Sequence, residues 1–325
     1  MRIVFMGTPD FSVPTLESLV KGGHEVLAVV TQPDKPKGRG KSVLMTPVKE
    51  KALELGIPVY QPVKVREPEF MEVLKGLDAE VFVVVAFGQI LPKEILEMPR
   101  YGCVNVHASL LPRYRGAAPI QWAVIDGEAV SGVTTMLMDE GLDTGDMLEK
   151  AEIPLDKEET GGSLFEKLSL LGGELILSTL EKLQNGTAVR TPQGEPDTPY
   201  AKMLKKSMGQ IDWSMEAEKI ERLIRGLNPW PSAYTSLNGK TVKIWAAEVV
   251  PGNGTGAPGR AAVSRDSLCA SQGQPSGGDG KGSSFHQGAP AGGEKADGYS
   301  RFLKRLPGGG RYGPGSIRRE EICIC

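Results

Sequence analysis

An almost unbroken apolar run of Val, Phe and Ala over residues 80–87 most constrains how this chain can fold. Apolar residues that do not alternate with polar ones are typical of a central parallel strand buried on both faces. An apolar strand over residues 2–6, a helix over 12–21 and a second strand over 25–31 form a βαβ start. We therefore predict an α/β, Rossmann-like fold with a mostly parallel sheet.

The chain has 325 residues, which is long enough for roughly two domains with separate cores. Its 40% hydrophobic and 24% charged residues are typical of a globular protein, and a net charge of −2 indicates no general affinity for polyanions. We predict a first domain over residues 1–189, a linker over 190–208, the start of a smaller C-terminal domain over 209–255, and a Gly-rich tail over 256–325.

Targeting and metal-binding signals are missing from the sequence. The first apolar run is too short for a signal peptide, and no run approaches the roughly 18 residues of a membrane helix. Four Cys, three of them in the tail, do not form a disulfide framework, and His24, His107 and His286 have no metal-ligand spacing. We expect a reduced, cytoplasmic protein without a metal.

The segment 103–116 is the first candidate for chemistry. It begins as an apolar strand and breaks into a loop at Ser109. Asn105 and His107 have the same parity, so a strand places both on one face, roughly 7 Å apart along the chain. An amide can donate to a developing oxyanion, and an imidazole can move a proton near neutral pH.

A second polar loop over residues 138–146 follows another apolar run and supplies the carboxylates Asp139, Glu140, Asp143 and Asp146. A carboxylate could orient the imidazole of His107, and an amide, an imidazole and a carboxylate together suit acyl transfer. Spacing alone leaves open which of the four carboxylates takes this part.

A basic loop lies between the second strand and the next helix. Its cations alternate with Pro and Gly, which indicates an exposed loop without regular structure. The cations are Lys35, Lys37, Arg39 and Lys41. Such a loop is either simply solvated or a contact surface for phosphates.

Two long motifs carry a family resemblance. They are Asn-Val-His-Ala-Ser-Leu-Leu-Pro-Arg-Tyr-Arg-Gly-Ala-Ala-Pro-Ile-Gln at 105–121 and Met-Asp-Glu-Gly-Leu-Asp-Thr-Gly-Asp at 138–146. Both resemble motifs of the methionyl-tRNA formyltransferases of bacteria. The resemblance runs from residue 1 to about residue 250. It implies an enzyme of translation initiation that transfers a formyl group from 10-formyltetrahydrofolate to the α-amino group of methionyl initiator tRNA, acting as a monomer.

The resemblance also implies roles for particular residues. It places His107 beside the formyl carbon, Asn105 as donor to the oxyanion, and Asp143 as partner of the imidazole. It places the folate donor against two loops, the second through main-chain hydrogen bonds: Ser109, Leu110, Leu111 and Pro112, and then Phe87, Gly88, Gln89, Ile90 and Leu91. In this family the basic loop inserts into the acceptor arm of initiator tRNA.

The C-terminal region follows the family only in part. Residues 228–234 resemble the opening of the family's small, OB-like β-barrel, and Asn238-Gly239 predicts a hairpin between strands 234–237 and 241–246. Residues 256–325 hold 16 Gly and few large apolar residues, too few to offset the entropy of ordering them. We expect an incomplete barrel, followed either by a frame-shifted segment from about Cys269 or by a natural disordered tail.

Two other functions are compatible with parts of the sequence. A glycinamide ribonucleotide transformylase or a formyltetrahydrofolate hydrolase shares the Asn, His and Asp, but neither needs the basic loop or the Pro-Trp-Pro-Ser segment at 229–232. An RNA-binding module without catalysis would not need the set of Asn105, His107 and Asp143.

Overall fold

The computed structural model describes residues 1–36, 43–237, 239–250, 260–262 and 268–270. It divides the chain into two compact units, which are described separately. The first comprises residues 1–205 and 225–231, and the second comprises residues 206–224 and those from 232 onward. The predicted tail beyond residue 270, with the frame-shift hypothesis attached to it, lies outside the described residues.

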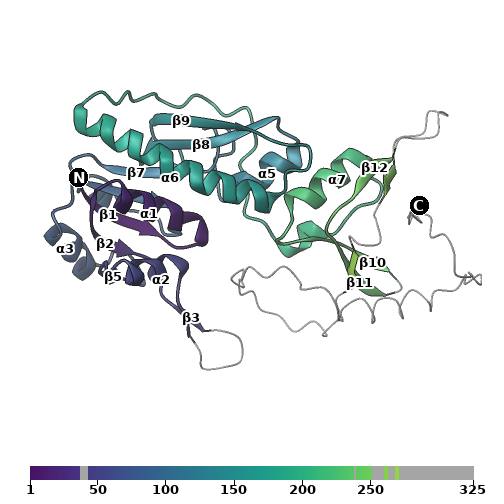
Figure 1. Ribbon diagram of the computed structural model, residues 1–325, viewed down its shortest axis with the longest axis horizontal. Coiled ribbons are helices and arrows are strands. Elements are labelled where there is room, and N and C mark those ends of the chain that lie inside the picture. Colours follow the sequence, from purple (N-terminus) through teal and green to yellow (C-terminus); the bar gives the residue numbers. More distant parts are fainter. Residues whose placement is uncertain (37–42, 238, 251–259, 263–267, 271–325) are drawn as a thin grey trace, which may run out of the picture. The chain divides into compact units, whose positions relative to one another are not determined.

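A 7-stranded sheet forms the centre of the first unit, in the order β5-β2-β1-β6-β7-β8-β9 (Figure 1). The strands are β1 (Arg2–Gly7), β2 (Glu25–Val30), β5 (Val59–Tyr60), β6 (Val81–Val85), β7 (Cys103–His107), β8 (Val130–Leu137) and β9 (Met147–Pro154). Pairing is parallel from β5 through β7 and antiparallel for β8 and β9. The prediction of an α/β fold with a mostly parallel sheet is confirmed, and all of β6 is buried, as its apolar run predicts.

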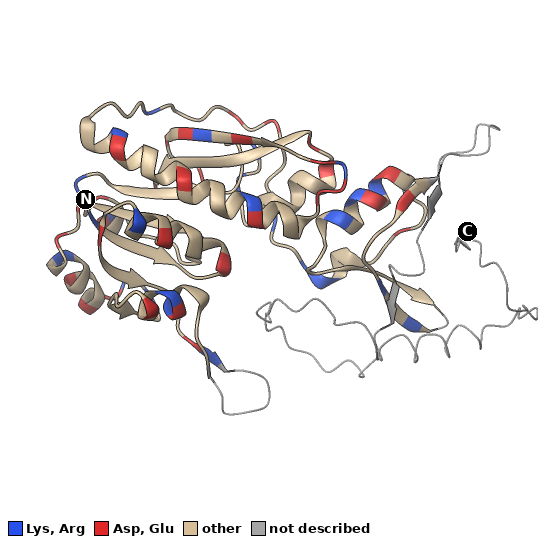
Figure 2. Cartoon of the chain, viewed as in Figure 1, with Lys and Arg blue, Asp and Glu red and all other residues tan. Residues whose placement is uncertain are grey.

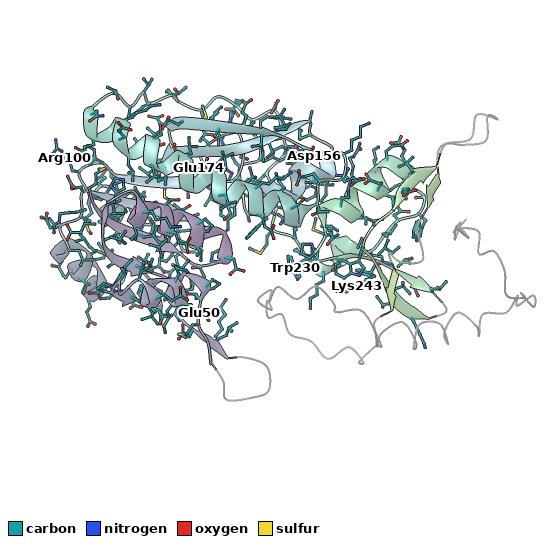
Figure 3. All side chains as sticks on the ribbon, viewed as in Figure 1. Glu50, Arg100, Asp156, Glu174, Trp230 and Lys243 are labelled. Carbon is teal, nitrogen blue, oxygen red and sulfur yellow. The ribbon has the colours of Figure 1, made fainter. Side chains whose placement is uncertain are left out.

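Helices cover both faces of this sheet. They are α1 (Val13–Lys21), α2 (Pro47–Glu54), α3 (Pro68–Gly76), α4 (Lys93–Leu96), α5 (Pro119–Asp126) and α6 (Gly161–Asn185). One core joins the sheet to α1, α2, α5 and α6, and the other joins it to α3 and α4; Figure 3 draws the side chains that fill these layers. Lys and Arg are interspersed with Asp and Glu over these helices (Figure 2).

The pair Gly172-Gly173 inside α6 has a packing reason that the sequence alone does not reveal. A Cβ at Gly172 would lie 2.8 Å from the side chain of Val106 on β7. A Cβ at Gly173 would lie 2.7 Å from Ser18 Oγ and 3.1 Å from the carbonyl of Pro14, both on α1. The two glycines therefore let α6 approach β7 and α1 closely, which offsets the roughly 1 kcal/mol that each costs the helix.

Replacing Gly173 with Leu is expected to lower the free energy of unfolding by about 1–3 kcal/mol, because the side chain must force α6 away from α1. Urea unfolding followed by circular dichroism measures this change. The matched control is Gly76→Leu at the end of α3, where a Cβ meets nothing within 4 Å. Equal losses in the two variants would contradict the packing explanation.

The second unit contains a small β-structure. Strands β10 (Ala233–Leu237) and β11 (Lys240–Ile244) form the predicted hairpin, in which Leu237 pairs with Lys240, and β14 (Leu268–Ala270) pairs with β11. A second pair consists of β12 (Glu248–Val250) and β13 (Arg260–Ala262). Two strands therefore lie beyond the expected boundary at residue 255. The other elements are η2 (Lys206–Gly209) and α7 (Ala217–Gly226), whose last two residues belong to the first unit.

Most of the predicted linker packs as part of the first unit. Residues 190–205 belong to the first unit, and the division falls after Lys205. Thr191 pairs with Met147 at the start of β9, and Ala201 makes main-chain hydrogen bonds to Arg115, Ala117 and Ala118. This segment therefore packs against the loops that follow β7 and precede β9.

Candidate active site

Asn105 and His107 lie on β7, with His107 as the last residue of the strand. Both side chains are buried, with 9% and 6% of their surface exposed. Val104 and Val106 pack into the core beneath α6, so the alternation of the strand directs Asn105 and His107 to the opposite face. Among the described residues, no side-chain hydrogen bond to the Asn105 amide is found, which leaves its N–H groups for a ligand.

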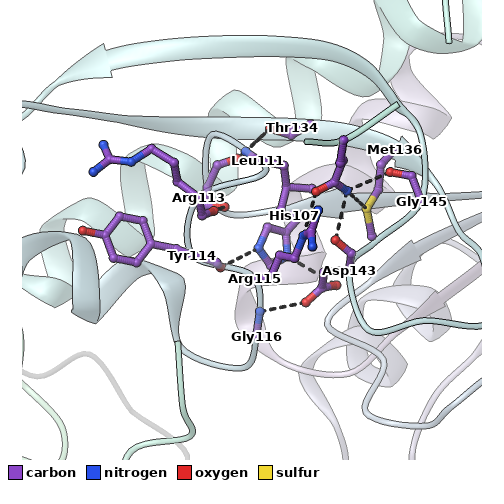
Figure 4. A network of polar contacts seen from close by, with 12 residues as sticks. His107, Leu111, Arg113, Tyr114, Arg115, Gly116, Thr134, Met136, Asp143 and Gly145 are labelled. Atoms are coloured by element: carbon purple, nitrogen blue, oxygen red, sulfur yellow. Dashed lines mark hydrogen bonds and ion pairs between the residues drawn. The ribbon is translucent and has the colours of Figure 1, made fainter. Parts of the chain in front are cut away.

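The imidazole of His107 lies between two oxygen atoms (Figure 4). Its Nε2 is 3.1 Å from the carbonyl oxygen of Tyr114, and its Nδ1 is 3.7 Å from Asp143 Oδ1. A carbonyl oxygen can only accept, so Nε2 carries a proton and donates a hydrogen bond to the Tyr114 carbonyl. Nδ1 is then the ring atom at which a proton can be taken up or released. The neighbouring Asp143 carboxylate stabilises the protonated ring.

Asp143 is held in place by its own loop and by the loop after β7. Its backbone is in the left-handed region with φ of 57°, a conformation in which Asp is tolerated better than most residues. Its second carboxylate oxygen, Oδ2, accepts a hydrogen bond of 2.9 Å from the Gly116 N–H. The loops 113–116 and 143–145 therefore meet at the carboxylate.

The rival carboxylates of the 138–146 loop are placed differently. Asp139 Oδ1 accepts hydrogen bonds from the Gly141 N–H and from Thr144 Oγ1, so it caps its own turn. Asp139 and Glu140 are exposed, and Asp146 is half-buried. Asp143 is the one that the structure places within ion-pair distance of His107.

The segment 109–112 is fixed by hydrogen bonds to β8. Thr134 Oγ1 donates to the Ser109 carbonyl at 2.7 Å and accepts from the Leu111 N–H at 3.1 Å. Ser109 Oγ donates to the carbonyl of Arg113. Leu111 is fully buried with Met136 and Met147, whereas Leu110 and Pro112 are half-buried. The side chains available for ligand contact are therefore those of Leu110 and Pro112.

The second predicted folate loop, residues 87–91, follows β6, the parallel neighbour of β7, so both loops lie at the same edge of the sheet. The Phe87 carbonyl accepts hydrogen bonds from Thr8 Oγ1 at 2.9 Å and Gln32 Nε2 at 3.2 Å. The Gln89 side chain binds the main chain of residues 62 and 65. Phe87 and Leu91 are buried, whereas Gly88 and Ile90 are exposed, so the loop presents residues 88–90.

The basic loop is described only at its root. Lys35 lies exposed on β3 (Lys35–Pro36), which pairs with β4 (Val43–Leu44). Asp34, which precedes β3, accepts a hydrogen bond of 2.5 Å from Lys49 Nζ and another from Gln61. Lys37, Arg39 and Lys41 lie outside the described residues.

A group of polar residues behind His107 was not predicted from the sequence. Arg113 donates two hydrogen bonds to Glu128, at 2.8 and 2.7 Å, and the Tyr114 hydroxyl donates to Glu128 at 2.7 Å. Burial, and then the hydrogen bond to Glu128, raises the pKa of Tyr114 well above its ordinary value, and the hydrogen bond to Glu128 raises the pKa of Arg113. This group fixes the position of Tyr114, whose carbonyl accepts the hydrogen bond from His107. Arg113 and Tyr114 belong to the motif at 105–121, but nothing in the sequence indicates Glu128 as their partner.

The pKa of Glu128 lies below its ordinary value, because hydrogen bonds from Arg113 and Tyr114 outweigh the opposing effect of burial. The carboxylate therefore stabilises the fold above its unfolded-state pKa of about 4.3, and this contribution is lost as pH falls through the lower folded-state value. We expect Glu128→Gln to be less stable than wild type at neutral pH, with a difference that shrinks below a pH of about 4. Urea unfolding over a pH series tests this, and a difference independent of pH would contradict it.

The part of the chain that the structure describes also contains a buried thiol and lacks two other features. No group of His, Cys, Asp and Glu there could hold a metal ion. Burial raises the pKa of the Cys103 thiol to about 12, so little thiolate exists there at neutral pH. No helix among these residues is long and apolar enough to cross a membrane.

A cavity of about 390 Å³ opens beside Asp143. Its lining combines apolar side chains with one guanidinium and three hydroxyls, from Arg115, Leu142, Thr144, Pro196, Thr198, Pro199 and Tyr200. Leu142 and Thr144 flank Asp143 in sequence, so the cavity borders the loop that carries Asp143. A second cavity, of about 470 Å³, is lined mostly by charged residues near the start of α6 and does not include these residues.

Most of the sequence matches known families and proteins. Residues 1–180 match the formyl transferase family, and residues 203–274 match the formyl transferase C-terminal domain, so the second match runs past residue 250. A methionyl-tRNA formyltransferase from Agathobacter rectalis is 61% identical over 259 residues, which cover 80% of this chain and 84% of the relative. One from Clostridioides difficile is 56% identical over 250 residues, covering 77% and 81%.

Solved structures share the fold at lower identity. A sugar N-formyltransferase from Shewanella sp superposes with a TM-score of 0.59 at 19% identity, covering 77% of this chain and 99% of that one. An N-formyltransferase from Helicobacter canadensis, in complex with folinic acid and dTDP-3-aminofucose, gives 0.55 at 19% identity, covering 76% and 87%. These likenesses are evidence for the architecture alone.

Proposed function

The chain belongs to the formyl transferase family, and from this premise we propose that it transfers the formyl group of 10-formyltetrahydrofolate to the α-amino group of methionyl initiator tRNA. The observation that carries the proposal is the 61% identity to a methionyl-tRNA formyltransferase over 84% of that relative's length. The chain then serves translation initiation in the cytoplasm, as a monomer.

The reaction forms a bond from the amine nitrogen to the formyl carbon and breaks the bond from that carbon to N10 of the folate, which takes up a proton as tetrahydrofolate leaves. The neutral amine loses one proton when it becomes the amide, so the two proton transfers balance. An α-amino group has a pKa of roughly 7.7–8.0, so much of it must first be deprotonated at neutral pH. The unpartnered amide of Asn105 is suited to donate a hydrogen bond to the tetrahedral oxyanion. His107 takes up or releases a proton at Nδ1, and Asp143 stabilises the positive charge on the protonated imidazole.

We place the folate donor at the edge of the sheet where β6 and β7 end. The predicted contacts are the main chain of residues 88–91 and the exposed parts of residues 109–112. The carbonyl of Phe87 is already engaged by Thr8 and Gln32, so the main-chain contacts fall on the residues after it. No metal takes part in this scheme.

The basic loop is proposed to bind the acceptor arm of the tRNA through its cations. Neutralising all four, in a variant with Lys35, Lys37, Arg39 and Lys41 changed to Gln, should raise the KM for charged initiator tRNA. Each lost phosphate contact should reduce the slope of log affinity against log salt by up to about one unit.

Steady-state kinetics at two salt concentrations measure this effect, with the KM for 10-formyltetrahydrofolate as the internal control, because that KM should not change. A matched variant with Lys150, Lys157, Lys202 and Lys205 changed to Gln removes the same charge from elsewhere on the first unit. Wild-type tRNA kinetics in the loop variant at both salt concentrations would refute the assignment of the loop.

The rival formyl-folate enzymes differ in their acceptor. Relatives at 54–61% identity are methionyl-tRNA formyltransferases, whereas the likeness to a glycinamide ribonucleotide transformylase is 16% in sequence with a TM-score of 0.50. Supplying methionyl-tRNA, glycinamide ribonucleotide and water as competing acceptors tests the proposal. We expect kcat/KM to favour methionyl-tRNA by several orders of magnitude, and a preference for either rival acceptor would overturn the proposal.

A further inference from the structure

We propose that Gln193 is a positioning residue for Asp143, acting from a segment that crosses the active-site loops. The inference rests on the proposed function where it predicts a change in kcat. It rests on the structure alone where it predicts a change in amide hydrogen exchange. Residues 191–201, called the strap here, follow α6 in the sequence and belong to the first unit. They have no place in the reaction described above.

The strap is joined to both loops that surround His107. Thr191 exchanges two main-chain hydrogen bonds of 2.9 Å with Met147, next to the loop that carries Asp143. Thr198 Oγ1 accepts a hydrogen bond of 2.8 Å from the Tyr114 N–H, and the Ala201 N–H donates to the Arg115 carbonyl. The strap therefore contacts the Tyr114 side and the Asp143 side of the imidazole.

Gln193 is the one side chain of the strap that binds the two loops at once. Its Nε2 donates to the carbonyl of Asp143 at 2.9 Å and to that of Gly145 at 2.7 Å, and it lies 3.8 Å from Met136 Sδ. Its Oε1 accepts from Arg115 Nε at 2.9 Å. Figure 4 labels the partners of these contacts, Arg115, Met136, Asp143 and Gly145, around His107.

The chemistry of the three partners fixes the orientation of the amide. Carbonyl oxygens only accept and a guanidinium only donates, so the NH₂ group must face Asp143 and Gly145, and the oxygen must face Arg115. No other uncharged side chain of this length offers two donors and an acceptor in one plane. Glu could satisfy Arg115 but would place an oxygen against the two carbonyls.

Asp143 needs such support. Its φ of 57° is in the left-handed region, which costs free energy for a residue with a Cβ and persists only where the surroundings hold it. Gln193 holds its carbonyl and Gly116 holds its carboxylate, so the two contacts together define where the side chain lies relative to His107. Without Gln193 the loop can relax and move Oδ1 away from Nδ1.

Gln193→Leu tests the proposal, because Leu keeps the bulk and removes all three hydrogen bonds. We expect kcat for formyl transfer to fall by about 10- to 100-fold, because small displacements of catalytic groups carry penalties of this order, while both KM values change by less than about threefold. Gln193→Glu, which keeps the contact to Arg115, should show a similar loss and serves if the Leu variant does not fold. Val189→Ala, at an exposed residue just before the strap, is the control expected to behave as wild type.

A double-mutant cycle separates positioning from a general structural role. In the Asp143→Asn background, the further change Gln193→Leu should lower kcat by less than about threefold, because the group that Gln193 positions is already disabled. Equal losses in the wild-type and Asp143→Asn backgrounds would overturn the proposal. So would a Gln193→Leu variant with kcat within threefold of wild type.

A measurement without substrate keeps this inference apart from the proposed function. The Gly116 N–H donates to Asp143 Oδ2, so its hydrogen exchange, followed by NMR, reports whether the carboxylate is in place. Exchange at Gly116 should accelerate in Gln193→Leu and stay unchanged in Val189→Ala. If wild type transfers no formyl group, the proposed function fails, and Gly116 exchange alone decides this inference: unchanged exchange in Gln193→Leu overturns it.

Discussion

His107→Ala is expected to lower kcat for formyl transfer by about 10²- to 10⁴-fold, the range for a residue that moves a proton in the transition state. The affinity for 10-formyltetrahydrofolate should change little, because the proposed folate contacts lie on the loops 88–91 and 109–112. Single-turnover formylation measures the chemical step, and equilibrium titration with a folate measures binding.

His24→Ala is the matched control for this prediction. His24 directly precedes β2, and its ring lies 3.2 Å from the Met1 amine. The His24→Ala variant therefore removes the same kind of side chain without changing the candidate site. A His107→Ala variant that folds and retains most of its turnover would exclude the imidazole from the mechanism.

Asn105→Ala is expected to lower kcat by about 10²- to 10³-fold, the cost of losing one donor to an oxyanion. The Asn105 side chain is buried at 9% exposure and is not bonded to another described residue, so its donors are free for the transition state. Because this interaction develops with the charge on oxygen, kcat should fall while KM stays nearly constant.

Asn105→Asp gives the shape-matched comparison. It keeps the size of the side chain but replaces the NH₂ donors with an oxygen, so its turnover should be at least as low as that of Asn105→Ala. A loss below tenfold in both variants would transfer the oxyanion role to a main-chain N–H.

The fold was largely predictable because its signals are local. The apolar run of β6 and the βαβ start of β1, α1 and β2 each follow from the local pattern of apolar residues, and the structure confirms these elements. The Gly172-Gly173 pair shows where local reasoning ends. Its cost to the helix is visible in the sequence, but its benefit depends on β7 and α1, which the sequence does not place beside α6.

The candidate site was predictable in part. Strand parity alone placed Asn105 and His107 on one face, but the choice of Asp143 among four carboxylates depended on family resemblance. The structure brings Asp143 to His107, and their catalytic roles remain predictions. The contacts of the Tyr114 carbonyl and of Gln193 could not be predicted, because main-chain acceptors leave no signature and Gln193 lies 50 residues from Asp143 in the sequence.

The most direct test of the proposed function is the product that the protein forms on charged initiator tRNA. Purified protein is incubated with 10-formyltetrahydrofolate and methionyl initiator tRNA, and the amino acid released from the tRNA is identified by mass spectrometry. We predict N-formylmethionine with wild type and with His24→Ala, and a strongly reduced rate with His107→Ala. Folded wild-type protein that binds folate yet forms no N-formylmethionine would contradict the proposed function.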